Sequence, residues 1–423
     1  MMLKASAVQV DITPPVGCYM SGYMERKSPS VGIHDPLKAQ VLMLALDGST
    51  QVIVTMDVIA VDAAFTSTLR AFAEKKLNIA GENVMVACSH THSGPQGFLS
   101  SMPAMNELSD PQFSESILRK ITGAMQWANS TLNPANLFIG RDTGMGIGLN
   151  RNDPSVGLND QEVTVLRVDD LLGKPVAVLF NYGCHATVMG DANLLISADF
   201  PGAARHTLES LYPETVFMFC NGGAGDVSTR FTRRQASFDE VERFGRILAG
   251  AVIKAMETAE ASQSSRLECR SVQAELPVKP FPSKEAVEGT MAELKAQLAE
   301  MQKGNQPMGE QRKLVTRIEG AEILMRLSEL FVGQKSVLAE MQIRRTGDLV
   351  IITIPGEPFS KTVLDIKAHY TPDPVMVVSY ANDYKGYLPE SAGGVTTYED
   401  FVSPYTSEAA LSVKKAIMEA KES

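Results

Sequence analysis

The chain has 423 residues, of which 44% are hydrophobic and 21% are charged, and its formal net charge at pH 7 is -10. This composition is typical of a folded globular protein and excludes a disordered or collagen-like chain. The acidic balance, with no cluster of Lys and Arg, argues against nucleic acid as a partner.

The N-terminal sequence MMLKASAVQVDITPP lacks the basic start and apolar segment of a secretory signal. No apolar run reaches the roughly 18 residues that a membrane span requires. The five cysteines are scattered and form no C-x-x-C pair; they are Cys18, Cys88, Cys184, Cys220 and Cys269. We therefore expect a cytoplasmic location and free thiols, and we take Cys88 and Cys184 as small core residues rather than ligands.

Short apolar runs typical of strands alternate with helical patterns as far as about residue 260. The expected strands include 39–46, 52–57, 84–89, 163–168, 176–181 and 216–220. The expected helices include 64–77, 113–128 and 238–257. This alternation predicts a mixed α/β (α+β) fold in which helices cover a central sheet.

Residues 283–331 have a different pattern, because their apolar residues recur at intervals of three and four. The first series is Val287, Met291, Leu294, Leu298 and Met301, and the second, after the sequence GNQP, is Leu314, Ile318, Ala321 and Met325. The pattern predicts a helical hairpin, and we favour packing against the main body over a dimer coil or a lid. The earlier alternation resumes at 349–354, 359–369 and 375–380. We therefore expect a single domain over 1–423 with a helical hairpin insertion at about 283–331.

Two histidines, His90 and His92, follow the apolar run 84–89 in the sequence SHTHSGP. Residues i and i+2 of a strand point to the same face, so we expect the two imidazoles to project together at the strand end. Ligands often bind at such ends, which makes the pair a candidate for metal binding or acid–base chemistry. Two structurally satisfied histidines would explain the pattern equally well.

A second strand-end histidine, His185, follows the run 176–181. Since neutral imidazole is a good zinc donor, His90 and His185 could share one ion although they come from different strands. Asp199 stands just before an expected helix, and we interpret it as the cap of that helix.

Three later stretches also place polar residues after apolar runs. Ser228, in NGGAGDVS, is a candidate nucleophile, but a role in a tight turn fits it equally well. Glu357, in PGEP, could add a carboxylate to two histidines in a metal shell, although alone it reads as a surface acid. The loop NDYKGYLP carries Tyr384 and Tyr387.

These stretches, in this order, resemble the neutral (non-lysosomal) ceramidase family in its N-terminal catalytic domain, including its short bacterial relatives. The matching pieces are SHTHSGP, the strand ending at His185, NGGAGDVS, PGE and NDYKGY, together with DITPPVG and GIHDPL near the N-terminus. The resemblance extends over nearly the whole chain.

The resemblance implies one Zn²⁺ as cofactor, held by His90, His185, Glu357 and Tyr387. It places Tyr387 rather than Tyr384 in this set through the N-x-Y-x-x-Y pattern. It also implies that His92 acts as an acid/base or substrate contact and that Arg151, in the sequence GLNRN, lines the site.

Two features depart from the family pattern. The family motif G-D-V-S is normally followed by Pro-Asn, whereas Ser228 is followed here by Thr229 and Arg230. The chain ends at Ser423, so we expect no C-terminal immunoglobulin-like domain. With 6% aromatic residues, long-chain ceramide is not the obvious substrate.

Together these observations predict a zinc-dependent hydrolase that cleaves an amide or related acyl bond of a small molecule through a metal-activated water. His92 would protonate the leaving nitrogen, and Tyr387 or Arg151 would stabilise the oxyanion. Two alternatives stay open: a serine hydrolase that uses Ser228, and a non-catalytic protein that binds metal and ligand. The sequence is compatible with an oligomer.

Overall fold

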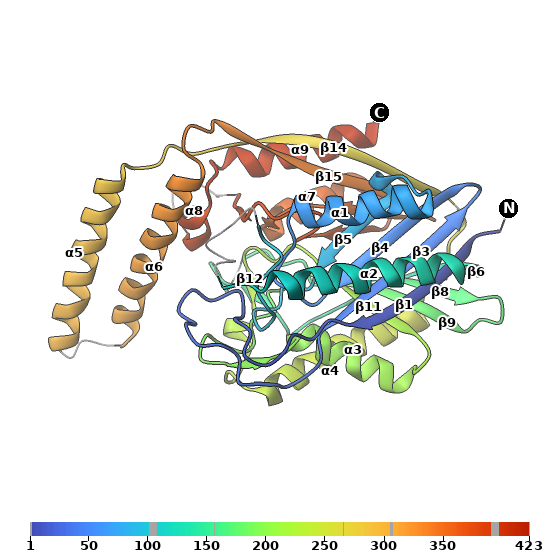
Figure 1. Cartoon of the computed structure of the whole chain (residues 1–423), viewed down its shortest axis with the longest axis horizontal. Helices are drawn as coiled ribbons and strands as arrows, with labels where there is room; N and C mark the ends of the chain where they lie inside the picture. Colours follow the sequence, from blue (N-terminus) through green and yellow to red (C-terminus); the bar gives the residue numbers. More distant parts are fainter. Residues whose placement is uncertain are drawn as a thin grey trace.

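The computed structural model describes residues 2–100, 108–155, 157–264, 266–304, 308–390 and 397–422, and Figure 1 shows the arrangement of its elements. The longer strands are β1 (Lys4–Asp11), β3 (Lys38–Leu46), β4 (Ser49–Met56), β5 (Val84–Cys88), β6 (Asn133–Thr143), β8 (Glu162–Asp170), β9 (Pro175–Tyr182), β11 (Val216–Asn221), β14 (Leu267–Pro277), β15 (Ser336–Thr346), β16 (Leu349–Thr353) and β18 (Val375–Val378). The short strands are β2 (Gly32–Ile33), β7 (Leu149–Asn150), β10 (Leu195–Ile196), β12 (Val227–Ser228), β13 (Glu260–Ala261), β17 (Glu357–Pro358) and β19 (Tyr387–Leu388). The α-helices are α1 (Ala63–Phe72), α2 (Pro111–Ser130), α3 (Asp199–Leu211), α4 (Phe238–Glu257), α5 (Lys284–Lys303), α6 (Met308–Leu330), α7 (Ser360–Tyr370), α8 (Tyr398–Val402) and α9 (Glu408–Glu422).

Two sheets form the centre of the molecule. Among the described residues, the larger sheet has the strand order β11-β9-β8-β6-β1-β3-β4-β5, with β13 beside β6, and the smaller has the order β14-β15-β16-β18. Apolar side chains of both sheets share one core, in which Leu42, Ile53 and Leu179 meet Ile351 and Met376. The sheets therefore pack face to face.

Helices cover the outer face of each sheet. α1 and α2 share a core with β3, β4 and β5, whereas α3 and α4 share one with β8, β9 and β11. α7 and α9 pack on the smaller sheet, in the upper part of the view in Figure 1. This order of layers confirms the predicted mixed α/β fold with a helix-covered central sheet.

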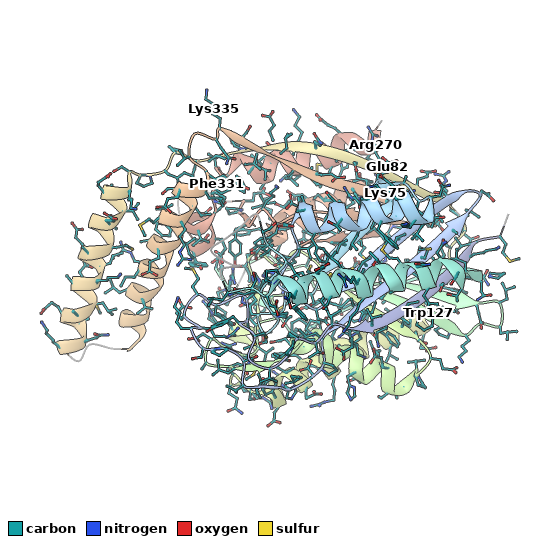
Figure 2. The ribbon with its side chains drawn as sticks, in the orientation of Figure 1. Lys75, Glu82, Trp127, Arg270, Phe331 and Lys335 are labelled. Carbon is teal, nitrogen blue, oxygen red and sulfur yellow. The ribbon has the colours of Figure 1, made fainter. Side chains whose placement is uncertain are left out.

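The predicted helical hairpin is present as α5 and α6, which project from one end of the molecule in Figure 1. Its apolar residues mainly face each other across the hairpin: Leu294 packs with Leu314 and Ile318. Contact with the body is made at its base, where Phe401 of α8 joins the cluster of Val287 and Ala321. The expected packing against the main body therefore holds only at the base, near Phe331 in Figure 2. Residues 305–307, within the GNQP break, lie outside the described part of the chain.

Candidate metal centre

The predicted site residues lie where strands of the large sheet end. His90 comes two residues after β5, and His185 comes three residues after β9. The two segments run together, because Thr91 and Ala186 form a parallel bridge. Asn221, at the end of β11, holds both: its Nδ2 donates to the carbonyl oxygens of Ser89 (3.0 Å) and Cys184 (3.1 Å).

Glu357 and Tyr387 reach the site from the C-terminal third of the chain. They are directly opposite one another in the parallel pair of β17 and β19. Glu357 Oε2 lies 3.1 Å from His185 Nε2 and 3.7 Å from His90 Nε2. The Tyr387 hydroxyl lies 3.3 Å from His185 Nε2. The structure thus brings together the four residues that the resemblance implied as ligands.

Both histidines present the nitrogen that a metal requires. Nδ1 of His90 donates to the carbonyl oxygen of Ile59 (2.7 Å), and Nδ1 of His185 donates to that of Ala224 (2.6 Å). A carbonyl oxygen can only accept, so these contacts place the proton on Nδ1 and leave Nε2 with a free lone pair.

The spacing of these atoms fits a zinc ion. Ligands at about 2.1 Å from a tetrahedral zinc lie about 3.4 Å from each other, close to the observed separations of 3.1, 3.3 and 3.7 Å. His92 joins the group, since its Nε2 is 3.4 Å from His90 Nε2. The ligand atoms of His90, His92 and His185 all lie within 4.8 Å of one another.

The protonation states suit the same purpose. Burial lowers the pKa of His90 to about 4, despite the opposing effect of Glu357, so the imidazole is neutral at pH 7. Burial alone would raise the pKa of Glu357, but the interactions with His90 and His185 outweigh burial and lower the pKa to about 2, so the carboxylate is ionised. Neutral imidazole beside a carboxylate is a donor set that zinc prefers.

Two other tyrosines position the carboxylate. The Tyr384 hydroxyl donates to Glu357 Oε1 at 2.5 Å, and the Tyr380 hydroxyl donates to Oε2 at 3.2 Å. Tyr380 also stacks on His90, with ring centroids 3.8 Å apart. Because Tyr384 is engaged with Glu357 while Tyr387 faces His185, the geometry favours Tyr387 as the tyrosine ligand.

Arg151 borders the site as expected. Its guanidinium donates to the Tyr387 hydroxyl (3.1 Å), to the carbonyl oxygen of Gly225 (2.9 Å) and to Glu399 (2.6 Å). Burial lowers the pKa of Arg151, but Tyr387 and Glu399 outweigh burial and raise it well above its ordinary value. The side chain is therefore a fixed positive charge at the edge of the histidine cluster.

His92 is held by the N-terminal loop. The guanidinium of Arg26 donates to the carbonyl oxygen of His92 (2.7 Å), and the Tyr23 ring lies 4.9 Å from its imidazole. Gly22 approaches so closely that a Cβ there would be 2.4 Å from the ring. The Nδ1 atom of His92 is buried without a hydrogen-bond partner, so packing holds that edge of the ring while Nε2 faces His90 Nε2.

Three sequence interpretations need correction or completion. β5 ends at Cys88, and His90 has φ of 62°, so strand alternation does not explain how His90 and His92 meet. Asp199 is not the cap of α3: it is the first helical residue, and its carboxylate accepts from the backbone N–H groups of Phe200 and Val188. Ser228 lies beside His185 in a backbone bridge, and its hydroxyl accepts from the N–H of Arg230 (3.4 Å).

Sequence reasoning missed several residues that build the site. Tyr380 ends an apolar run and gave no sign that it stacks on His90. Asn221 opens the stretch NGGAGDVS, yet its two carbonyl partners lie 132 and 37 residues away in the chain. Glu399 is 248 residues from Arg151. Such contacts depend on the tertiary fold, and only a polar residue at a strand end hinted at Asn221.

Two cavities lie outside the histidine cluster. One of about 650 Å³ is lined by Trp127, residues 5–9 of β1 and the turn at Leu171 and Leu172. One of about 170 Å³ lies between Arg70 of α1 and Glu340 of β15. Neither contains a predicted site residue.

Cys88 and Cys184 lie in the apolar cores beneath the site as buried free thiols.

Comparison with known proteins identifies a family for the chain. Residues 5–237 match the family model described as neutral/alkaline non-lysosomal ceramidase, N-terminal. The neutral ceramidase of Pseudomonas aeruginosa is 30% identical over 255 residues, which are 53% of this chain and 38% of that protein. The neutral ceramidase of Oryza sativa is 29% identical over 223 residues, which are 47% of this chain and 28% of that protein.

The same likeness is found in the fold. The crystal structure of neutral ceramidase from Pseudomonas aeruginosa superposes with a TM-score of 0.76 and 21% identity, covering 100% of this chain and 75% of that one. The chain spans well under half the length of the curated relatives it matches. Because the family model covers more than half of its residues, the chain belongs to the neutral/alkaline non-lysosomal ceramidase family.

Proposed function

We propose that this protein is a zinc-dependent hydrolase of an amide (N-acyl) bond in a small molecule. The observation that carries the proposal is the meeting of His90 Nε2, His185 Nε2, Glu357 Oε2 and the Tyr387 hydroxyl at distances suited to one ion. Zinc, when bound, supplies a Lewis acid that polarises the scissile carbonyl and acidifies water. Relatives named neutral ceramidase support ceramide as the first amide to assay.

The protein's own groups would perform the remaining tasks. Arg151 and the Tyr387 hydroxyl face the cluster from one side and would stabilise negative charge on the carbonyl oxygen. His92 lies on another side and would take up the proton released by the attacking water and pass it to the leaving nitrogen, since an amine anion is a prohibitive leaving group near neutral pH. Tyr380 and Tyr384 would keep Glu357 in place.

The metal content of purified protein tests the proposal. We expect about one zinc per chain in the wild type and in His206→Ala, which changes an exposed histidine of α3. His185→Ala should lose both the zinc and amide hydrolysis, because it removes one ligand and leaves Glu357 facing a gap. Elemental analysis together with an amide assay measures both.

Two results would contradict this assignment. The first is turnover in protein that holds no metal and takes none up when zinc is added. The second is loss of turnover on treatment with a serine-directed acylating reagent, combined with indifference to chelators, which would make Ser228 the nucleophile. Bound zinc with tight ligand capture but no turnover would instead identify a non-catalytic binding protein.

A further inference from the structure

The smaller of the two cavities, of about 170 Å³, contains none of the candidate metal ligands but several hydrogen-bond donors that have no acceptor. It is lined by Thr66 and Arg70 of α1, by Glu340 of β15, and by Asn382 and Asp383 in the loop that follows β18. Thr66 Oγ1, Arg70 Nε and Nη2, and Asn382 Nδ2 are buried without a hydrogen-bond partner among the described residues. Because buried polar atoms are almost always paired, these four atoms indicate a bound molecule that the chain itself does not supply.

Arg70 presents an unused edge of its guanidinium group. Its Nη1 atom donates to Glu340 Oε2 at 2.8 Å, which leaves Nε and Nη2. The N–H bonds of these two atoms lie on one edge of the group and point in parallel, the arrangement that holds a carboxylate or a phosphate by two hydrogen bonds. Glu340 does not serve this edge, because its other oxygen, Oε1, accepts from the Ser271 hydroxyl at 2.6 Å. The unused edge of Arg70 therefore fits an oxyanion.

The amide of Asn382 is fixed so that its nitrogen is the atom without a partner. Its Oδ1 accepts from the backbone N–H of Val86 at 2.9 Å, and its own backbone N–H donates to the carbonyl oxygen of Val86 at 2.8 Å. Because an N–H group needs an acceptor, the amide is held in this orientation and Nδ2 is a donor. Asn382 is 3% exposed, and Thr66, which is 1% exposed, adds a hydroxyl that can also donate.

The two carboxylates at the cavity already have partners. Those of Glu340 are described above. Asp383 Oδ1 accepts from the backbone N–H groups of Ala63 (3.1 Å) and Tyr384 (2.8 Å), and its Oδ2 pairs with Lys385 at 2.7 Å. Neither acid accepts from the four unpaired atoms. The cavity therefore has an excess of donors, which a ligand rich in acceptors would satisfy.

The size and the exposure of the cavity define this ligand further. Pockets for drug-sized molecules measure about 300–1,000 Å³, so a cavity of about 170 Å³ suits a group of a few atoms. Ser67 and Gln273, which also line the cavity, are exposed, so a small solute can enter from solvent. We propose that Arg70, Thr66 and Asn382 bind a small oxyanion, a carboxylate or a phosphate, by hydrogen bonds to its oxygens.

A bound oxyanion would connect α1 to the loop that supports the candidate metal centre. Asn382 lies two residues from both Tyr380 and Tyr384, whose hydroxyls donate to Glu357. The ligand would therefore stabilise the packing of α1 against this loop. The inference goes beyond the proposed hydrolase, and it requires neither zinc binding nor amide hydrolysis.

Thermal unfolding of the full chain tests the oxyanion site, with sodium acetate and inorganic phosphate as probes. Each probe replaces sodium chloride at constant ionic strength. We expect at least one of them to raise Tm saturably, because a ligand that binds only the folded state stabilises it. Half of the rise should occur at a concentration on the order of 1 mM, since a few hydrogen bonds give millimolar affinity. The more effective probe identifies the oxyanion as a carboxylate or as a phosphate.

Two substitutions remove donors in different ways. Arg70→Lys keeps a positive charge beside Glu340 but replaces the two-donor edge with one ammonium group, so it should raise the half-saturating concentration by about tenfold. Thr66→Val removes the hydroxyl with little change of shape and should raise that concentration several-fold. The control is Arg119→Lys, which changes an exposed arginine of α2 that pairs with Glu115 at 2.6 Å. It should respond as the wild type does.

Three results would overturn the inference. The first is a wild-type Tm that neither probe raises saturably, which would mean that water fills the cavity. The second is an unchanged response in Arg70→Lys or, should that variant not fold, in Thr66→Val. The third is loss of the response in His185→Ala, which would place the anion at the candidate metal centre. A response that persists in His185→Ala supports the oxyanion site whether or not the protein proves to be a zinc hydrolase.

Discussion

At the scale of single residues, backbone conformation decides where the chemistry sits. His90 adopts a left-handed conformation, with φ of 62°, which costs free energy for a residue with a side chain. The cost is tolerated because Nδ1 of the ring bonds to Ile59 while the ring stacks on Tyr380. Strained residues held by several contacts in this way are characteristic of functional sites.

Gly22 provides a sharp test of how His92 is positioned. Its φ is 101°, and a Cβ would lie 2.4 Å from the His92 ring. Gly22→Ala should therefore displace the imidazole and lower kcat by about 10- to 100-fold, because misplacement by about 1 Å can cost this much. Zinc content should not change, since His90, His185, Glu357 and Tyr387 are untouched. Elemental analysis and steady-state kinetics measure both.

Gly17 supplies the matched control for this substitution. It has nearly the same φ, 100°, but a Cβ there would meet nothing within 4 Å. Gly17→Ala should share the backbone cost of about 1 kcal/mol and keep its kcat. Equal losses of kcat in the two variants would mean that backbone strain, and not contact with His92, is responsible.

At the scale of elements, sequence patterns predicted those parts of the fold that are buried and continuous. The runs that became β5, β9 and β16 consist almost entirely of apolar residues, and α4 was predicted with its observed bounds. By contrast, β14 and β15 did not appear among the expected strands, because charged residues recur in LECRSVQAELP and SVLAEMQIRRT, which are partly exposed. Half-exposed strands lack the apolar signal that identifies buried ones.

The same limit applies to the candidate site. Histidines at strand ends and a Glu after a Pro-Gly turn can be recognised along the chain, and the family resemblance added Tyr387. Nothing in the sequence, however, indicates that β17 pairs in parallel with β19 and sets these two residues opposite each other. The observation that favours Tyr387 over Tyr384, namely that Tyr384 bonds to Glu357 while Tyr387 faces His185, comes from the structure and not from the sequence.

The hairpin of α5 and α6 yields a prediction for an element. Gly320 of α6 lies against Phe401 of α8, and α8 also carries Glu399, the partner of Arg151. Replacing 283–330 by a short Gly/Ser linker should leave zinc content unchanged, because the hairpin supplies no ligand. It should lower kcat/KM by several-fold, since α8 and Glu399 would be held less firmly and Arg151 would lose part of its orientation.

The linker is feasible because the ends of the hairpin are close, with the rings of Phe281 and Phe331 6.3 Å apart. Phe401→Ala in the full chain should reproduce part of the loss if the effect passes through α8. A linker variant with wild-type kinetics would show that the hairpin has no influence on the site. Zinc content and kcat/KM of both variants decide the matter.

At the scale of the whole molecule, the candidate metal centre connects distant parts of the chain. His90 and His185 follow strands of the large sheet, whereas Glu357 and Tyr387 belong to the segments around the smaller sheet. No helix among the described residues is long and apolar enough to cross a bilayer. Because the four candidate ligands come from both sheets, a bound ion would act as a crosslink between the two layers that form the core.

Removal of metal should therefore reduce the stability of the whole fold. A ligand present at about 1,000 times its Kd adds about 4 kcal/mol to the free energy of unfolding. We expect a chelator to lower Tm by several degrees in the wild type and in His206→Ala, and to have no effect on His185→Ala. Differential scanning calorimetry with and without chelator measures the change in Tm. A wild-type Tm that is the same in both conditions would contradict a zinc crosslink.

The candidate ligands are far apart in the sequence, so they are synthesised at different times. His185 and Tyr387, whose side chains meet at 3.3 Å, are 202 residues apart. At the usual speed of synthesis, about 5 to 20 residues per second, roughly 10 to 40 seconds separate their emergence from the ribosome. For most of that interval the two histidines exist without Glu357, and for all of it without Tyr387, so the four candidate ligands are complete only after Tyr387 has been synthesised.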